Sequence, residues 1–429
     1  MTSKNIAIVF STGRTQVREV AAAFMDNLRL FGHTDAHRIT LYLSIDTSLE
    51  GAHFSNDFLT DIPIKIISDA DRRQLARQLL GKHWQRLDGC FLSGNGYAPQ
   101  RNAAILEALQ DGQDYLIFFD DDEYPHVPKI APGETTLSWY RHDTLAPHLE
   151  AFENGDDVSY GYYLGYPLPV IALTGLLPKE TLRAFGKALS LGCEVVYEDT
   201  FIHEPVYRYI VIEESYASDD TLLLTPQLLT PQSAQTAHGI RYPYDKAPLD
   251  VAFRGGNLGI NLHSIRNGKI PFLFFNPASA RGEDIIFYNV IQDIAKVRLV
   301  DSFIFHDPFQ EHLSILNGHF PTALPPPKSN EKTQTRFAQT LLGWLKYAPL
   351  FISQTTHAKP AYHAHMQKML HDMRMPLQEL GTALPSQPLA GSIHVLQQAA
   401  DHIDPDLANL ALAQELFLDA IMPAVNDWD

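Results

Sequence analysis

Three consecutive carboxylates, Asp120 to Asp122, stand at the end of the apolar run that begins at Tyr115. Like charges side by side repel, and each carboxylate resists leaving water. A divalent cation would resolve this conflict, because Mg²⁺ and Mn²⁺ prefer hard oxygen ligands and often keep waters and substrate phosphates as further ligands. Asp120 and Asp122 are two residues apart at a strand end and can share one such ion. Simple exposure in an acidic turn would also relieve the repulsion.

Two other segments carry groups suited to phosphate binding or proton transfer. The glycine-rich stretch that starts at Ser93 runs into Arg101 and Asn102 at a predicted helix start. Such a loop lets the backbone approach a phosphate, and an arginine can pair with a diphosphate, although an ordinary loop with an exposed arginine has the same pattern. Glu283 and Asp284 open another predicted helix, where carboxylates are also favourable as helix caps.

The elements that position these residues alternate between strand and helix over residues 1–130, which predicts a mostly parallel sheet with helices on its faces. Strands are predicted at 5–11, 38–46, 62–69 and 114–120, and helices at 15–31, 71–80 and 101–109. Ligands of such sheets bind beyond the carboxyl ends of the strands. Asp46, Asp69 and the three carboxylates all fall at such ends, so we expect them at one edge.

The rest of the chain is predicted to be less regular. Further strands are expected at 157–173, within 263–275 and at 297–306, a helix after Gly255–Asn257, a helix at 178–191, and a loop rich in Pro, Thr and Gln around 225–247. Residues 321–332 have the composition of a linker. Asp404 and Pro405 are a favourable cap and first-turn pair, and they predict a helix over about 405–421.

Composition restricts the partners and the location. Lys and Arg total 33 and Asp and Glu total 50, for a net charge of −17, which argues against a nucleic-acid partner and against docking on anionic lipid. Cys90 and Cys193 form no zinc or redox motif, and buried free thiols are favoured over a disulfide. The apolar run Ile6–Phe10 is too short for a signal peptide. We therefore expect a cytoplasmic protein with no transmembrane segment.

The order of these motifs resembles that of nucleotide-sugar glycosyltransferases of the GT-A fold, most closely family-2-like members. The resemblance covers about residues 4–310 and is carried by IAIVFSTGR, Asp46, GNGYAPQRNAAI, FFDDD, RGGNLGI and RGED. It implies an α/β domain with a Rossmann-like, mostly parallel mixed sheet flanked by helices, followed by a C-terminal helical region. On that basis we expect a catalytic domain over 1–320, a linker over 321–332 and helices over 333–429. Within the catalytic domain, residues 1–130 would be the nucleotide-binding half, and 131–320 the acceptor half with an insertion at about 178–250.

The resemblance also implies a function and a set of site residues. A sugar would move from a nucleoside-diphosphate sugar of the UDP or GDP type to an acceptor hydroxyl, with Mg²⁺ or Mn²⁺, in an enzyme of the hexosyltransferase class. The metal would lie at Asp120, Asp122 and His306, and the donor at Ser11, Thr12, Asp46, Asp69, Arg101, Asp120 and Asp121. Asp284 would be the base, with Glu283 beside it, and Gly256, Asn257 and Tyr162 would contact the acceptor. Asp284 as base predicts inversion, whereas Asp284 as a helix cap leaves retention open.

Several alternatives remain at this point. The chain has no QxxRW motif of processive polysaccharide synthases, which favours a single transfer. A sugar-phosphate nucleotidyltransferase would show a richer glycine loop than STGRTQVRE after the first strand. A binding or scaffold protein could keep the fold without turnover. The four histidines of 357–371 are expected on a solvated helix, with no metal, and the C-terminal helices could form an oligomer.

Overall fold

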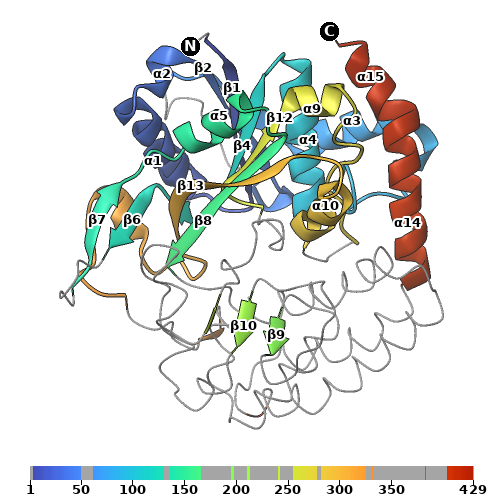
Figure 1. Cartoon of the computed structure of the whole chain (residues 1–429). Coiled ribbons are helices and arrows are strands. Elements are labelled where there is room, and N and C mark those ends of the chain that lie inside the picture. Colours follow the sequence, from blue (N-terminus) through green and yellow to red (C-terminus); the bar gives the residue numbers. More distant parts are fainter. Residues whose placement is uncertain are drawn as a thin grey trace.

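The computed structural model describes residues 3–49, 61–129, 136–165, 255–277, 282–324 and 403–428, with short pieces at 195–197, 210–212, 240–241, 330–331 and 382. Their central feature is an eight-stranded sheet in the order β3-β2-β1-β4-β12-β8-β13-β5 (Figure 1). Outside the described residues lie the predicted helix at 178–191, all of the loop at 225–247 except 240–241, residues 325–329 and 332 of the linker, the histidines of 357–371 and Cys193. Cys90 is buried.

The first half of the sheet is parallel, as the alternating pattern predicts. Its strands are β1 (Asn5–Thr12), β2 (Arg38–Ile45), β3 (Ile64–Ile67) and β4 (Tyr115–Asp120). The helices between them are α1 (Val17–Leu30), α2 (His33–Ala36), α3 (Asp69–Leu80) and α4 (Tyr97–Gln110). β1 lies between β2 and β4, with Ser11 opposite both Ser44 and Asp120. The loops after β1, β2 and β4 therefore meet at one edge.

The second half of the sheet is mixed. Its strands are β12 (Leu258–Asn261), β8 (Val158–Gly165), β13 (Val297–His306) and the two-residue β5 (Glu123–Tyr124). β12 is antiparallel to both β4 and β8, β8 is parallel to β13, and β5 is antiparallel to β13. The carboxyl ends of β8 and β13 and the amino end of β12 thus lie at the same edge as the ends of β1, β2 and β4.

Two layers of helices cover the sheet because successive side chains of a strand point to opposite faces. Ile6, Ile8 and Phe10 of β1 belong to the core under α1 and α5 (Ala146–Glu153), whereas Ala7 and Val9 belong to the core on the other face. That second face is covered by α3, α4, α9 (Leu262–Arg266), α10 (Glu283–Ile291) and the C-terminal helix. A separate hairpin joins β6 (His126–Lys129) to β7 (Ser138–Arg141).

Three sequence predictions are wrong in detail. Residues 263–275 are not a strand: α9 occupies the start, and the apolar run that follows is buried without strand pairing. The reason is Asn102, whose amide donates to the Phe274 carbonyl at 2.7 Å and accepts from the Phe274 N–H at 2.9 Å, so a side chain replaces a neighbouring strand. Gly255–Asn257 precede a strand, β12, where a helix was expected. α4 begins at Tyr97, which puts Arg101 one turn inside the helix.

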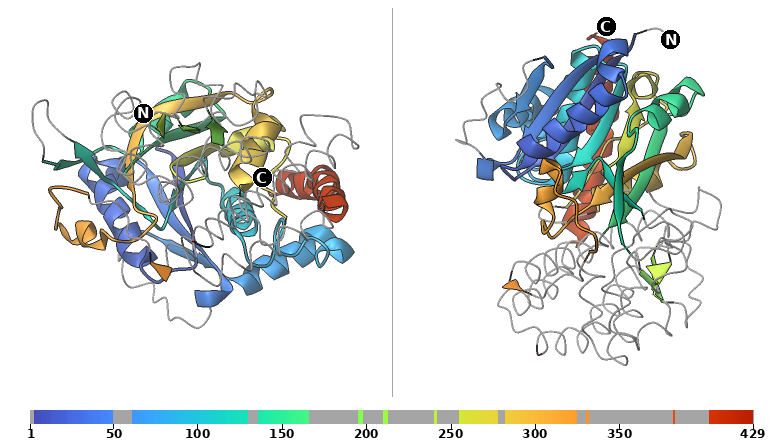
Figure 2. Two further views of the ribbon diagram at one scale, coloured as in Figure 1. Left: turned by 90° about the horizontal axis from the view of Figure 1, so that it is seen from below. Right: turned by 90° about the vertical axis from the view of Figure 1, so that its left-hand side faces the viewer.

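The C-terminal helix packs against the second face of the sheet. It comprises α14 (Ile403–Leu416), a π-helical turn (Phe417–Ile421) and α15 (Met422–Asn426). Figure 2 shows it on the side of the sheet opposite α1. The buried side chains recur every three or four residues, at Leu410, Ala413, Phe417, Ile421 and Val425. Among the described residues, Pro405–Asn426 is the one stretch long and apolar enough to cross a membrane, and its buried stripe is equally typical of a core helix.

Candidate functional site

The acidic turn after β4 is neutralised in part by an arginine from the neighbouring loop. Arg14 follows β1, and its Nη1 donates to Asp121 Oδ1 at 2.6 Å and to Asp122 Oδ2 at 3.1 Å. Thr12 Oγ1 also donates to Asp121, at 2.6 Å. Burial raises the pKa of Asp121 to about 6, and the charge of Arg14 opposes that rise. The parallel pairing of β1 with β4 explains this meeting, since it places both loops at one edge.

A second arginine links the acidic turn to helix α10. The guanidinium of Arg101 lies with Nη2 3.0 Å from Asp120 Oδ1 and Nη1 3.4 Å from Glu283 Oε1. Its side chain is only 2% exposed, and its guanidinium carbon is 5.4–5.7 Å from the ring centres of Tyr97, Phe118 and Phe274. Burial lowers the pKa of Arg101, but the carboxylates more than compensate, so the net pKa rises. A permanent cation therefore joins Asp120 to Glu283.

Two glycines bring the predicted base close to this cation. The N–H of Gly255 donates to Asp284 Oδ2 at 2.9 Å. A Cβ on Gly255 would lie 1.5 Å from Arg101 Nη1, and a Cβ on Gly256 would lie 1.9 Å from Glu123 Oε1. Only glycine lets the backbone pass this close to both side chains. The segment before β12 therefore covers Arg101 and Glu123 and holds Asp284 at the same time.

The end of β13 completes the acidic edge. His306 is its last residue, lies opposite Glu123 in the pairing of β13 with β5, and has Nε2 4.0 Å from Asp122 Oδ1. Its ring stacks on Tyr163, with centroids 5.3 Å apart. Glu123 is fully buried and accepts the Asp120 N–H at 2.9 Å. Burial and the charge of Asp120 raise the pKa of Glu123, which favours its protonated form.

A cavity of about 230 Å³ opens beside the acidic turn. Its lining comes from the ends of β1 and β2, the start of α4 and the turn after β4: Thr12, Gly13, Arg14, Asp46, Gly96, Tyr97, Gln100 and Asp121. Thr12, Asp46 and Asp121, all predicted to bind the donor, thus share one cavity. Ser11 is 2% exposed and does not line it.

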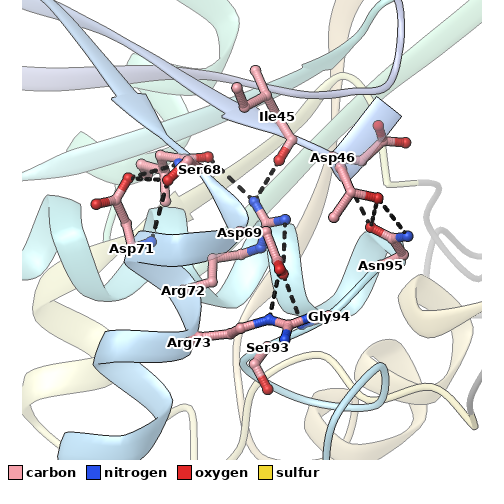
Figure 3. A network of polar contacts seen from close by, with 12 residues as sticks. Ile45, Asp46, Ser68, Asp69, Asp71, Arg72, Arg73, Ser93, Gly94 and Asn95 are labelled. Carbon is pink, nitrogen blue, oxygen red and sulfur yellow. Dashed lines mark hydrogen bonds and ion pairs between the residues drawn. The ribbon is translucent and has the colours of Figure 1, made fainter. Parts of the chain in front are cut away.

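Asp69 occupies a different place, at the start of α3 (Figure 3). Its carboxylate accepts the Gly94 N–H at 3.2 Å and pairs with Arg73 Nε at 2.6 Å. Asn95 in the same glycine-rich loop bonds Thr47 after β2, with 3.0 Å between Thr47 Oγ1 and the Asn95 oxygen. Asp69 therefore holds the loop that leads to Gly96 and Tyr97, and it does not line the cavity.

The residues predicted for the acceptor are dispersed. Gly256 adjoins Glu123, as described above. Asn257 is buried at a φ of 47°, and its side chain contacts His148 Nε2 at 3.0 Å and the Ser302 carbonyl at 3.0 Å. Tyr162 stacks on Phe303, with centroids 5.1 Å apart. Because strand residues alternate between faces, Tyr163 points to His306 and Tyr162 does not.

The donor atoms at the edge are of the kinds that a divalent cation accepts. Asp120 and Asp122 offer carboxylate oxygens and His306 an imidazole nitrogen, and Mg²⁺ and Mn²⁺ accept oxygen-rich ligand sets. The 4.0 Å between His306 Nε2 and Asp122 Oδ1 is a separation that two ligands of one ion can have. Within the described residues, however, no three His, Cys, Asp or Glu side chains already stand in a metal-binding cluster. Arg14 and Arg101 pair with those carboxylates.

Five residues of this edge were not predicted from the sequence: Arg14, Tyr97, Gln100, Glu123 and Tyr163. The position of Arg14 in the loop after the first strand is a signal that becomes informative once the sheet order is known. That loop must then adjoin the turn after the neighbouring parallel strand. Glu123 directly follows the three aspartates and is easily taken as more surface charge. Its burial depends on its pairing with β13, which no local pattern reveals.

Comparisons with known proteins give structural matches only. No family model and no curated protein matches the chain. It is similar to residues 1–349 of TarS from S. aureus (9% identity, 96% of this chain and 91% of that chain, TM-score 0.35). It is also similar to the mannosyltransferase PcManGT from Pyrobaculum calidifontis, solved with GDP-Man and Mn²⁺ (12% identity, 100% of this chain and 86% of that chain, TM-score 0.36).

A third match is glucosyl-3-phosphoglycerate synthase from Mycobacterium tuberculosis, solved with Mn²⁺, UDP and glucosyl-3-phosphoglycerate (10% identity, 80% of each chain, TM-score 0.31). The TM-scores all lie below 0.5, so the chemistry of the site rests on the residues of this chain alone.

Proposed function

We propose that the protein is a metal-dependent glycosyltransferase that moves a sugar from a nucleoside-diphosphate sugar to an acceptor hydroxyl. The observation that carries this proposal is the bridge made by Arg101 between Asp120 and Glu283. It links Asp120, a predicted metal ligand, to Glu283, the neighbour of the predicted base Asp284, at the edge of the sheet where ligands of α/β proteins bind. An acidic cation site next to a carboxylate base would serve inverting sugar transfer from a diphosphate, because the cation offsets the charge of the leaving group and the base takes the acceptor proton.

The cavity beside Asp121 is the proposed site for part of the donor. At about 230 Å³ it is smaller than the roughly 300–1,000 Å³ of pockets that enclose a drug-sized ligand. It therefore suits one part of a nucleotide sugar, and Tyr97 and Asp46 in its lining offer a ring and an acceptor to a base or ribose. Asp120 and Asp122, with His306, would hold Mg²⁺ or Mn²⁺, which offsets negative charge on the departing diphosphate.

The proposed reaction is a single displacement. The acceptor oxygen bonds to the anomeric carbon, the bond from that carbon to the diphosphate oxygen breaks, and the diphosphate leaves with the electron pair. The proton of the acceptor hydroxyl passes to Asp284. Gly255 orients that carboxylate through its N–H. This route inverts the anomeric configuration, which NMR of the product would reveal.

The testing experiment is calorimetric titration with UDP, GDP, CDP and dTDP, each with and without Mn²⁺. We expect one nucleotide to bind tightly, and only with the metal. The same titration of Asp122→Asn should show no metal-dependent binding, because a ligand is lost. Asp301→Asn, the same change at an exposed position of β13, is the matched control and should bind as the wild type does.

Two results would overturn this proposal. Absence of binding by all four nucleotides would favour a scaffold protein that has kept the fold without turnover. Unchanged affinity in Asp122→Asn would remove the metal from the donor site. A nucleotidyltransferase would instead consume a nucleoside triphosphate and a sugar phosphate with release of pyrophosphate, which a pyrophosphate assay detects.

A further inference from the structure

The two arginines at the acidic edge differ in how firmly they are held. Arg101 lies inside α4, is 2% exposed and is surrounded by three aromatic rings. Arg14 lies in the loop between β1 and α1, and its side chain is 23% exposed. It lines the cavity and is anchored there by Asp121 and Asp122. Arg101 is therefore enclosed by core side chains, whereas Arg14 is partly exposed at the wall of the cavity.

Arg14 and a divalent cation would compete for the same carboxylates. Nη1 of Arg14 is 3.1 Å from Asp122 Oδ2, and Asp122 is one of the two aspartates that would ligate the metal. A guanidinium this close to a doubly charged ion is repelled by it, most strongly in a site shielded from water. Both Asp121 and Asp122 have side chains only 8% exposed. A metal ion held by Asp122 would therefore bind at the expense of the Arg14 contact.

A diphosphate in the cavity would receive the displaced guanidinium. The planar fork of an arginine pairs with phosphate oxygens as well as with carboxylates. Arg14 already forms part of the cavity wall beside Thr12 and Asp121, so rotation of its side chain keeps it within reach of a ligand there. The exchange moves one positive charge from the carboxylates to the diphosphate as the metal takes its place.

We propose that Arg14 is a movable counter-cation that couples metal binding to nucleotide-diphosphate binding at this site. This inference rests on the proposed function. Without nucleotide, Arg14 holds the acidic turn and weakens binding of the metal alone. With nucleotide, Arg14 pairs with the diphosphate and the metal is bound tightly. Such coupling is reciprocal, so the metal must raise nucleotide affinity by the factor by which nucleotide raises metal affinity.

The test measures Mn²⁺ binding by the electron paramagnetic resonance signal of the free ion, with and without the nucleoside diphosphate that the wild type binds. Arg14→Gln removes the counter-cation and keeps a polar side chain. We expect it to bind Mn²⁺ alone more tightly than the wild type. We also expect it to lose most of the enhancement by nucleotide, which for coupled sites is typically about 5–150-fold. Arg14→Lys keeps the charge without the fork and should lie between the two.

Arg29→Gln is the matched control, because Arg29 on α1 is a half-exposed arginine that pairs with Asp26 and Asp61 away from the cavity. It should match the wild type in both titrations. If the wild type binds a nucleotide with Mn²⁺ and Arg14→Gln shows the same two Mn²⁺ affinities, the coupling role is wrong and the proposed function stands. If the wild type binds no nucleoside diphosphate with Mn²⁺, both are overturned.

Discussion

The N–H of Gly255 donates to the carboxylate of Asp284 at 2.9 Å, which ties the segment that leads into β12 to the first turn of α10. The bond orients one carboxylate oxygen from outside its own helix. Asp284 is therefore more than an ordinary helix cap, whose partners are the N–H groups of the helix it opens. This orientation is what a positioned base needs.

Asp284→Asn should abolish transfer and spare donor binding. The amide keeps the shape of the side chain and its oxygen can still accept from Gly255, but it cannot take a proton. General-base catalysis typically contributes about 10²–10⁴-fold to a rate, and turnover should fall by that factor while nucleotide affinity in calorimetry stays constant. Asp301→Asn serves again as the control. Transfer at the wild-type rate in Asp284→Asn would show that the base is another group.

Arg101→Met should destabilise the fold strongly. The methionine fills similar apolar space among Tyr97, Phe118 and Phe274, but it leaves the buried Glu283 and the partly exposed Asp120 without their shared cation. Loss of one partner of a buried ion pair costs about 3–5 kcal/mol, which urea unfolding would measure. Arg29→Met, at a half-exposed pair, should cost no more than about 1 kcal/mol. Equal costs for the two variants would mean that Arg101 is not a structural cation.

Phe417→Ala, on the buried side of the C-terminal helix, should lower the free energy of unfolding far more than Leu418→Ala on the exposed side. Phe417 is fully buried and lies edge-on to Phe272, with centroids 6.0 Å apart, whereas the next residue, Leu418, is 56% exposed. Truncation of a buried phenylalanine costs about 3–5 kcal/mol, and a surface change usually costs within about 0.5 kcal/mol. Thermal or urea unfolding of Phe417→Ala and Leu418→Ala compares them directly. Similar losses would argue that the helix does not pack as described.

Stability should depend on pH through His148. Its Nδ1 is 2.8 Å from Ser159 Oγ and its Nε2 is 3.0 Å from the Asn257 amide oxygen. Burial lowers the pKa of His148 to about 4, and the bond with Asn257 only partly opposes this. The unfolded chain takes up a proton below about pH 6.5, which the folded chain refuses until about pH 4. The free energy of unfolding therefore falls as pH drops through that window and is constant above it.

His148→Gln isolates that contribution, because glutamine can bond both neighbours and stays uncharged. Between pH 7.5 and pH 5 the wild type should lose about 2 kcal/mol more than the variant. Urea unfolding at the two pH values gives the loss of unfolding free energy for each protein. Subtracting the loss of the variant from that of the wild type removes the contributions of the other titrating groups, which the two proteins share. An identical pH dependence in the two proteins would place the His148 pKa at its ordinary value.

Much of the fold follows from local patterns. The first four strands and residues 297–306 match their predictions because each is a compact run of apolar residues bounded by polar ones. Residues 263–275 carry the same signal and are not a strand, because Asn102 bonds the Phe274 backbone from another element. No window of the sequence around 263–275 contains that information.

The residues of the candidate site also include some that local sequence patterns reveal and some that they do not. Asp46, Asp120–Asp122 and Glu283–Asp284 could be identified because strand ends and helix starts are visible in the sequence. The partners of Arg14 and Tyr163 could not be read from local patterns alone, since they depend on which strands are neighbours and which face a residue takes. Asn257 is the opposite case. It is a polar residue in a conspicuous motif, but its side chain forms buried hydrogen bonds with His148 and Ser302.

Only Asp121 and Asp122 separate the end of β4 from the start of β5, and β5 pairs with β13 through Glu123 and His306. In sheet order β12 and β8 come between β4 and β13, so this two-residue span fixes how far the sheet can open at its ligand edge. One inserted residue would swap Glu123 and Tyr124 between faces, since strand side chains alternate. The spacing of the aspartates is thus a length constraint on the whole edge, and a chain with the right charges but a longer turn would not assemble it.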